Sequence, residues 1–175
     1  LINIVNKLEP DYVNLHWIGN ETISLSDIKK INAKIIWTLH DMWPFCGAEH
    51  YSENDRYIQG YNKYNRPPNE KGIDLNKFVW NKKKKYFSKV EKVICTSKWM
   101  HDCAKKSFLF KDKQIEQIPW PIDTNFWQPL NQNFSKKFFG INENDKVILF
   151  GADNFLKNNR KGFDIFKEVI KKINQ

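Results

Sequence analysis

Residues Lys34 to Phe45 read KIIWTLHDMWPF, and this stretch decides the predicted fold. It is an apolar run that ends abruptly in a histidine, an aspartate and a turn that contains Pro44. A short, unbroken apolar run between polar residues is typical of a strand buried on both faces of a parallel sheet. Because such sheets bind ligands at the carboxyl ends of their strands, His40 and Asp41 are predicted to lie at a functional site.

A strand and a short helix are predicted directly before this run. The strand covers Asp11 to Ile18, and Ser24-Leu25-Ser26-Asp27 resembles a capping box that begins the helix. Strand, helix and strand within so few residues form a βαβ unit with a right-handed crossover, so the two strands run parallel. We therefore expect His16, near the end of the first strand, and His40, at the end of the second, to lie at the same edge of the sheet.

The segment from Asp41 to Asp74 shows no sustained period and carries several glycines and prolines. Ordinary connections run about 4 to 6 residues, so a connection of this length is predicted to be a substrate loop. Beyond it, Asp74 and Ser97 are expected to cap helices. Apolar runs at Lys92 to Thr96 and Gln114 to Ile118 predict two more strands and continue the α/β pattern.

A proline-stiffened, aromatic segment follows from Pro119 to Pro129 and predicts a linker. After it, Lys146 to Gly151 predicts a strand and Lys161 to Ile173 predicts a helix. The predicted organisation is a first domain over residues 1–118, a linker over residues 119–130 and the start of a second domain over residues 131–175.

The charge of the chain favours an anionic partner. Its 175 residues carry a formal net charge of +9, which suits nucleic acid, a sugar nucleotide or an acidic membrane face. The densest basic run, Lys82 to Lys85, falls within a predicted helix, where consecutive residues point around the whole circumference. A solvated helix face is therefore expected for this run, and contact with anionic lipid or a phosphate-bearing acceptor is the alternative.

Hydropathy and cysteine usage favour the cytosol. No apolar run approaches the ~20 residues needed to cross a bilayer, and the three cysteines show no metal-type spacing and are expected to be reduced. Five tryptophans are expected to anchor the core and the linker: Trp17, Trp37, Trp80, Trp99 and Trp127.

Several motifs stand along the chain in a recognisable order. They are Thr38-Leu39-His40-Asp41, Cys95-Thr96-Ser97 with Trp99, Ile118-Pro119-Trp120-Pro121-Ile122-Asp123, and Gly151 with Lys161-Gly162. In this order they resemble the motifs of the family 4 glycosyltransferases, of the bacterial polysaccharide-biosynthesis type. The resemblance implies the GT-B architecture, in which two Rossmann-like domains face each other across a cleft. It also implies an incomplete chain that holds the later part of the acceptor domain and only the start of the donor domain.

The resemblance assigns His40 as the catalytic residue, which would hydrogen-bond the donor sugar near the reacting carbon. It assigns Asp41, Trp43 and His16 to the acceptor side. From the residues alone, structural alternatives stay open: His40 and His16 can pack at the strand ends, and Asp41 can form a turn.

Donor binding is assigned to Gly151, Arg160 and Lys161. Arg160 would substitute for the family arginine, because Gly151 is followed here by Ala152-Asp153. A cation at a helix start, such as Lys161, opposes the helix dipole, which suggests an anion nearby. The nucleotide-sugar is the donor substrate, and no cofactor is expected.

A hydrolytic metal site is an alternative for the same region. Glu49 and His50, together with His40 and Asp41, imitate such a site in composition. Their spacing matches no defined ligand set, and a hard cation would want more carboxylates. No metal is therefore expected.

The combined prediction is an α/β protein with Rossmann-like parallel sheets and an incomplete GT-B architecture. Its function is predicted to be retaining transfer of a sugar from a nucleotide-sugar to a polysaccharide or lipid-linked acceptor, and the chain by itself is expected to be inactive. A nucleic-acid-binding module and a non-catalytic remnant of a glycosyltransferase are the alternatives. The expected location is the cytoplasm, with peripheral contact to an anionic membrane as a further possibility, and no nucleic-acid partner is expected.

Overall fold

The computed structural model describes residues 1–19 and 22–173. The chain divides into two compact units, Leu1–Ile122 and Asp123–Gln175, which we call the first and the second unit. Within the described residues, no helix is long and apolar enough to cross a membrane.

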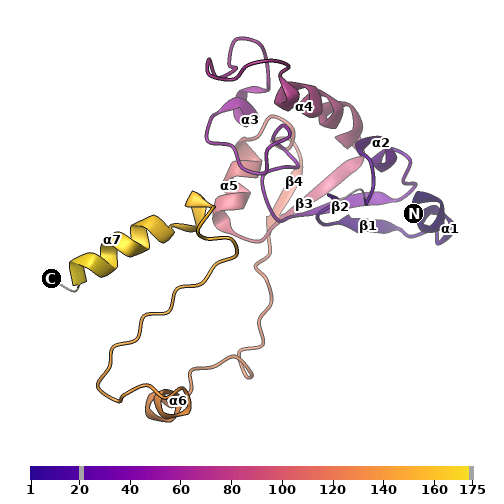
Figure 1. Cartoon of the computed structure of the whole chain (residues 1–175). Helices are drawn as coiled ribbons and strands as arrows, with labels where there is room; N and C mark the ends of the chain where they lie inside the picture. Colours follow the sequence, from indigo (N-terminus) through magenta and orange to yellow (C-terminus); the bar gives the residue numbers. More distant parts are fainter. Residues whose placement is uncertain (20–21, 174–175) are drawn as a thin grey trace. The chain divides into compact units, whose positions relative to one another are not determined.

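The described part of the first unit contains one parallel sheet (Figure 1). Its strands are β1 (Tyr12–Leu15), β2 (Lys34–Leu39), β3 (Val90–Cys95) and β4 (Gln114–Gln117), and they lie side by side in this order. All three neighbouring pairs are parallel. The predicted α/β class with a Rossmann-like parallel sheet is confirmed.

One helix of the first unit precedes the sheet and the others connect its strands. They are α1 (Ile2–Lys7), α2 (Leu25–Ile28), α3 (Arg56–Gln59), α4 (Leu75–Tyr86), the 3₁₀ turn η1 (Phe87–Lys89) and α5 (Lys98–Lys106). Side-chain caps begin α2, α4 and α5. The capping box at the start of α2 is present, since Ser24 and Asp27 exchange hydrogen bonds between side chain and backbone. Asp74 and Ser97 accept hydrogen bonds from backbone N–H groups in the first turns of α4 and α5, as predicted.

The core lies on the two central strands and the helices that cover them. Ile35, Trp37 and Leu39 of β2 are at most 1% exposed, and the ring of Trp37 lies 4.8 Å from that of Phe87, measured between centroids. These three residues alternate along the strand and therefore share one face of the sheet. On the opposite face Thr38 is buried but Ile36 is only half-buried, so the strand predicted to be buried on both faces is fully covered on one.

Three of the five tryptophans expected as anchors are exposed instead. Trp37 and Trp80 are buried, whereas Trp17, Trp99 and Trp127 are 45%, 53% and 67% exposed. Trp17 follows the end of β1, and Trp99 follows the end of β3. Their place beyond the strand ends takes them out of the core.

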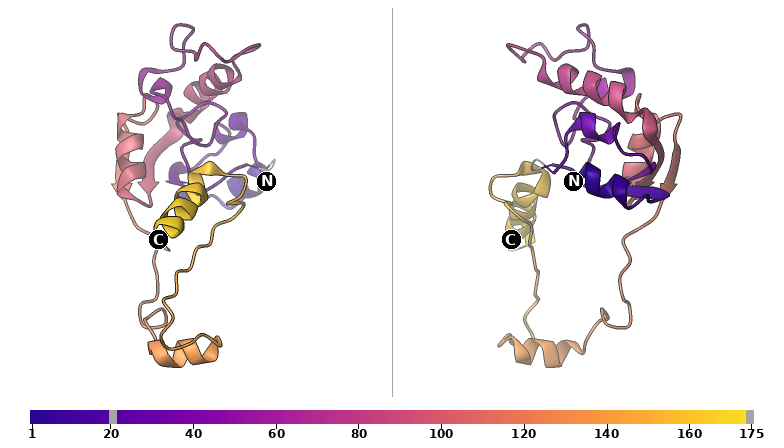
Figure 2. Two further views of the ribbon diagram at one scale, coloured as in Figure 1. Left: turned by 60° about the vertical axis from the view of Figure 1, so that its left-hand side comes forward. Right: turned by 90° about the vertical axis from the view of Figure 1, so that its right-hand side faces the viewer.

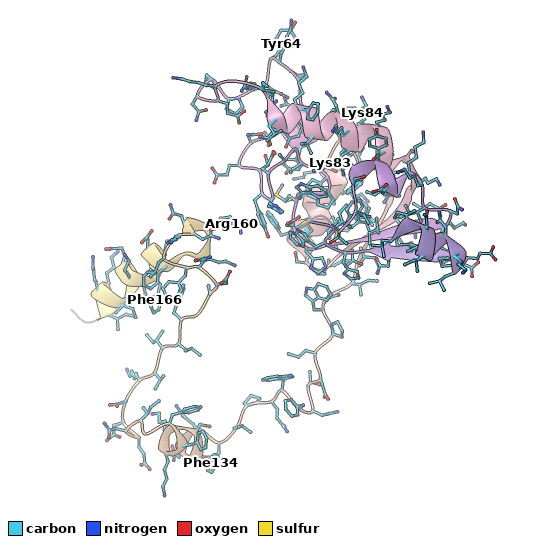
Figure 3. All side chains as sticks on the ribbon, turned by 45° about the vertical axis from the view of Figure 1, so that its right-hand side comes forward. Tyr64, Lys83, Lys84, Phe134, Arg160 and Phe166 are labelled. Carbon is cyan, nitrogen blue, oxygen red and sulfur yellow. The ribbon has the colours of Figure 1, made fainter. Side chains whose placement is uncertain are left out.

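The basic run in α4 is not a uniformly solvated face. Lys82, Lys84 and Lys85 are exposed, but Lys83 is fully buried. Figure 3 shows Lys83 and Lys84 on neighbouring positions of this helix. The prediction of a solvated run is wrong for Lys83, because its position turns toward the segment that follows β2.

The long connection between β2 and α4 is more ordered than its sequence suggests. It contains α3, and Figure 2 shows the remainder as an irregular loop next to α4 in both views. Arg56, 2% exposed, donates to both carboxylate oxygens of Asp74, at 2.5 and 3.4 Å, and to the side chain of Asn65 at 3.2 Å. Tyr64 stands at the tip of the loop and is 86% exposed (Figure 3).

The second unit contains α6 (Gln132–Phe138), the 3₁₀ turn η2 (Asn159–Lys161) and α7 (Phe163–Ile173). The strand predicted at Lys146 to Gly151 does not form, and Val147, Ile148 and Leu149 are exposed. A strand is stable only when neighbouring strands accept and donate its backbone hydrogen bonds, and no strand pairs with this segment in the described residues.

Aromatic contacts hold the end of the second unit together. The ring of Phe150 lies 4.6 Å from Phe166, 5.5 Å from Phe163 and 5.6 Å from Phe155. These contacts join α7 to the segment that precedes it.

Candidate functional site

The residues that follow the four strands gather polar and aromatic side chains at one edge of the sheet. His16 follows β1, His40 follows β2, Trp99 lies in α5 just after β3, and Trp120 follows β4. Because all strands are parallel, their carboxyl ends meet at the same edge, where α/β proteins place their ligands. We call this region the carboxyl edge.

His16 and His40 form a hydrogen-bonded pair, as their common edge predicted. The Nδ1 atom of His16 lies 2.9 Å from Nε2 of His40, and both side chains are exposed. On the other side, Nε2 of His16 lies 3.3 Å from the amide nitrogen of Asn14, and Asn14 Oδ1 accepts a hydrogen bond from Thr38 at 3.1 Å.

When both rings are neutral, this chain of contacts sets their tautomers. Asn14 donates through its amide nitrogen, so Nε2 of His16 is an acceptor and its proton is on Nδ1. His16 then donates to Nε2 of His40, which places the proton of His40 on Nδ1. His40 thus presents an N–H donor on the side of its ring away from His16.

Trp120 flanks His40 and was not singled out as a site residue from the sequence. Its ring lies 5.2 Å from the His40 ring between centroids, and 55% of the residue is exposed. The rule that placed His40 at the strand end applies equally to Trp120, which follows β4 after Ile118 and Pro119. The position of Trp120 after a predicted strand could therefore have identified it as a site residue from the sequence.

Asp41 is largely buried, 9% exposed, and forms both a turn and a hydrogen-bonded pair. Its Oδ1 accepts a hydrogen bond from the backbone N–H of Trp43 at 3.0 Å, which is the turn alternative considered for this residue. Its Oδ2 lies 2.5 Å from Nδ1 of His50. His50 is exposed, so the pair offers a polar group to a ligand while Asp41 orients the ring.

Aromatic rings extend the carboxyl edge on both sides of these polar pairs. The ring of Trp17 lies 6.4 Å from His50, and Tyr51 stacks against Trp99 with centroids 6.3 Å apart. Trp43 is half-buried, with its ring 6.4 Å from Trp37. We call the exposed rings of Trp17, Trp99 and Trp120 the aromatic rim.

In the part of the chain that the structure describes, no three histidine, cysteine, aspartate or glutamate side chains converge as metal ligands would. This arrangement gives no support to the alternative of a hydrolytic metal site. Glu49 instead accepts a hydrogen bond from the hydroxyl of Tyr61. Burial raises the pKa of Tyr61 above its usual value, so this hydroxyl stays protonated and keeps donating. Glu49 and His50 thus have separate partners.

The three residues expected to bind the donor belong to the second unit. Arg160 and Lys161 lie in η2, directly before α7, and Gly151 ends the segment in which the predicted strand did not form. Asn158 caps the turn by accepting a hydrogen bond from the backbone N–H of Arg160 at 3.2 Å. Lys161 is exposed at the entry to α7. Their binding role stays a prediction.

A Rossmann-like parallel sheet with polar pairs at its carboxyl edge defines the class of α/β proteins that bind or transform ligands at strand ends. The model of Glycosyltransferase Family 4 matches residues 1–126, and the chain belongs to this family. The match covers the whole carboxyl edge, whereas Gly151, Arg160 and Lys161 lie outside it. Searches of curated proteins and of solved structures found no match.

Proposed function

We propose that the protein is a retaining glycosyltransferase that moves a sugar from a nucleotide-sugar to a polysaccharide or lipid-linked acceptor. The hydrogen-bonded pair of His16 and His40 at the carboxyl edge carries this proposal. Membership of Glycosyltransferase Family 4 supports the type of reaction. The net charge of +9 suits an anionic donor and peripheral contact with an anionic membrane face.

In this proposal His40 is a hydrogen-bond donor to the transferred sugar. Its Nδ1–H is the atom that the contacts with His16 leave for a ligand. Positive charge builds at the anomeric carbon during glycosyl transfer, so a neutral ring serves better there than an imidazolium. His16 supports this state because its own N–H occupies Nε2 of His40.

The acceptor is proposed to lie along the aromatic rim. A pyranose has flat faces of C–H groups and an edge of hydroxyls, so it needs apolar rings beside polar groups. Trp17, Trp99 and Trp120 supply exposed rings, each with an apolar body and a polar N–H. The pair of Asp41 and His50 supplies a polar group beside Trp17, and Trp43 and His16 are proposed as further acceptor contacts.

The donor diphosphate is proposed to bind at Gly151, Arg160 and Lys161. A diphosphate leaving group gains negative charge as the sugar departs, and fixed cations or helix N-termini stabilise that charge. Arg160 and Lys161 stand directly before α7, which supports the placement. Lysine and arginine take the charge-stabilising role in this scheme.

The test is transfer by the full-length gene product with a panel of nucleotide-sugars and oligosaccharide acceptors. The expected product carries the anomeric configuration of the donor, read from the anomeric proton coupling in NMR. A product of opposite configuration would refute retention. Release of free sugar at the same rate with and without every acceptor would refute transfer.

A further inference from the structure

Lys83 is the one fully buried lysine among the described residues, and it stands within a run of exposed ones. Its side chain is 0% exposed, while Lys82, Lys84 and Lys85 on the same helix are exposed (Figure 3). Lysine is almost never fully buried unless its charge is compensated. The surroundings of its ammonium group therefore need an explanation.

The Nζ atom of Lys83 donates to three backbone carbonyl oxygens. They belong to Trp43, Cys46, at 3.1 Å, and Gly47. An ammonium group has three N–H donors and no acceptor, so these carbonyls match its charged form. Nζ also lies 3.8 Å from the centroid of the Trp43 ring, where a cation is attracted by the face of the indole.

All four contacts come from the segment directly after His40 and Asp41. The backbone of Trp43 is held at both of its polar groups: its N–H donates to Asp41 Oδ1 and its carbonyl accepts from Lys83. Asp41 in turn pairs with His50. The backbone of one residue, Trp43, and two hydrogen bonds thus link the ammonium of Lys83 to Asp41.

Burial of the Lys83 ammonium carries a desolvation cost. Burial lowers the pKa of Lys83 to about 7, and Cys46, Glu49 and Asp41 act in the opposite direction. Within the described part of the chain, neither Glu49 nor Asp41 forms an ion pair with it. An apolar side chain at this position would avoid the desolvation cost, so packing alone does not account for a lysine here.

We propose that Lys83 is a positioning residue for the carboxyl edge. On the acid side of its pKa, Lys83 carries an ammonium around which the segment Trp43–Gly47 folds, and this fold sets Asp41 and His50 in place. Its consequence for sugar transfer rests on the proposed function, whereas the positioning itself does not.

The first test uses the wild-type chain. Proton–nitrogen NMR on the acid side of the Lys83 pKa should show a lysine ammonium that exchanges slowly with water and gives cross-relaxation to the Trp43 ring. The Nδ1–H of His50, bonded to Asp41, should give a separate downfield signal. Absence of any slowly exchanging lysine ammonium would overturn the proposal.

The second test compares Lys83→Met with Lys84→Met, which changes an exposed lysine of the same helix. Methionine keeps most of the volume but leaves three carbonyls without their donor. The His50 Nδ1–H signal should disappear in the first variant and stay in the second. A folded Lys83→Met variant with an unchanged His50 signal would refute positioning.

The third test is chemical rescue of Lys83→Ala with methylammonium. A small cation can enter the space that the truncation leaves, and it should restore the His50 signal, whereas tetramethylammonium, which has no N–H donor, should not. If neither Lys83 variant folds, the wild-type ammonium signal decides. Failure of the full-length product to transfer sugar would refute the proposed function but leave these three measurements unaffected.

Discussion

His40 and His50 occupy comparable places at the carboxyl edge but have different partners. His40 is bonded to another histidine, His16, and has an aromatic neighbour in Trp120. His50 is bonded to a carboxylate, Asp41, which favours a proton on Nδ1. A histidine bonded to another ring and a histidine bonded to a carboxylate thus lie at one edge, so the two rings have different hydrogen-bonding roles.

Replacing His40 by alanine is expected to lower the turnover number of the full-length gene product by about 10² or more, the low end for a positioned catalytic side chain. The reason is loss of the Nδ1–H donor that we propose to bind the transferred sugar. His101→Ala is the matched control, since His101 lies on α5 and pairs with Asp102 at 3.2 Å. Wild-type turnover in a folded His40→Ala variant, checked by circular dichroism, would mean that His40 only packs at the strand end.

Replacing Lys161 by alanine is expected to weaken donor binding by about tenfold or more, as expected for a hydrogen bond to a charged group. Calorimetric titration with nucleoside diphosphates of each common base measures the effect. Lys167→Ala is the control, because this lysine of α7 pairs with Asp164 at 3.2 Å. Equal dissociation constants for the wild type and the Lys161 variant would remove Lys161 from the donor site.

At the scale of elements, α4 acts as a template for the segment that follows β2. Asn76 in its first turn accepts a hydrogen bond from the backbone N–H of Ala48 at 3.0 Å, and Lys83 binds carbonyls of the same segment two turns further on. Gly47 lies against the helix between these contacts, since a Cβ at this position would stand 2.6 Å from Cα of Asn76. The helix therefore shapes the loop through backbone contacts.

Gly47→Ala is expected to destabilise the first unit by about 1–3 kcal/mol, the usual cost of overpacking. The methyl group would meet the backbone of α4, which cannot rotate away as a side chain can. Urea denaturation followed by tryptophan fluorescence measures the change. Gly151→Ala, where a Cβ meets nothing within 4 Å, is the control. Equal midpoints for Gly47→Ala and the wild type would show that the loop has room to move from the helix.

At the scale of the whole molecule, the buried ammonium couples folding to pH. The pKa of Lys83 falls from 10.5 to about 7 on burial. Between these values the unfolded chain holds a proton that the folded chain has released, so raising the pH favours the folded state. Below about pH 7 both states are protonated, and this contribution no longer changes.

The free energy of unfolding of the wild type, minus that of Lys83→Met, should therefore rise by up to about 1.4 kcal/mol per pH unit above pH 7. Urea denaturation of both proteins from about pH 6 to about pH 9 measures this slope, because other titrating groups largely cancel in the difference. A flat difference would show that the three carbonyls keep Lys83 protonated throughout this range and outweigh its burial.

Sequence alone determined the features of this protein that depend on neighbours along the chain. The apolar run before His40, the capping box of α2 and the caps Asp74 and Ser97 are local patterns, and each formed as predicted. The parallel βαβ order then brought His16 and His40 to one edge, because the crossover has a single preferred hand.

Only the tertiary structure decided the contacts between distant segments. Lys83 and Trp43 are 40 residues apart, and nothing in the run of four lysines marks which one is buried. Arg56 likewise reaches Asp74 only because the intervening loop folds back. The apolar segment Lys146 to Gly151 has the composition of a strand, yet it stays irregular. A side chain's surroundings and a strand's hydrogen-bond partners come from other parts of the fold, so local patterns cannot specify them.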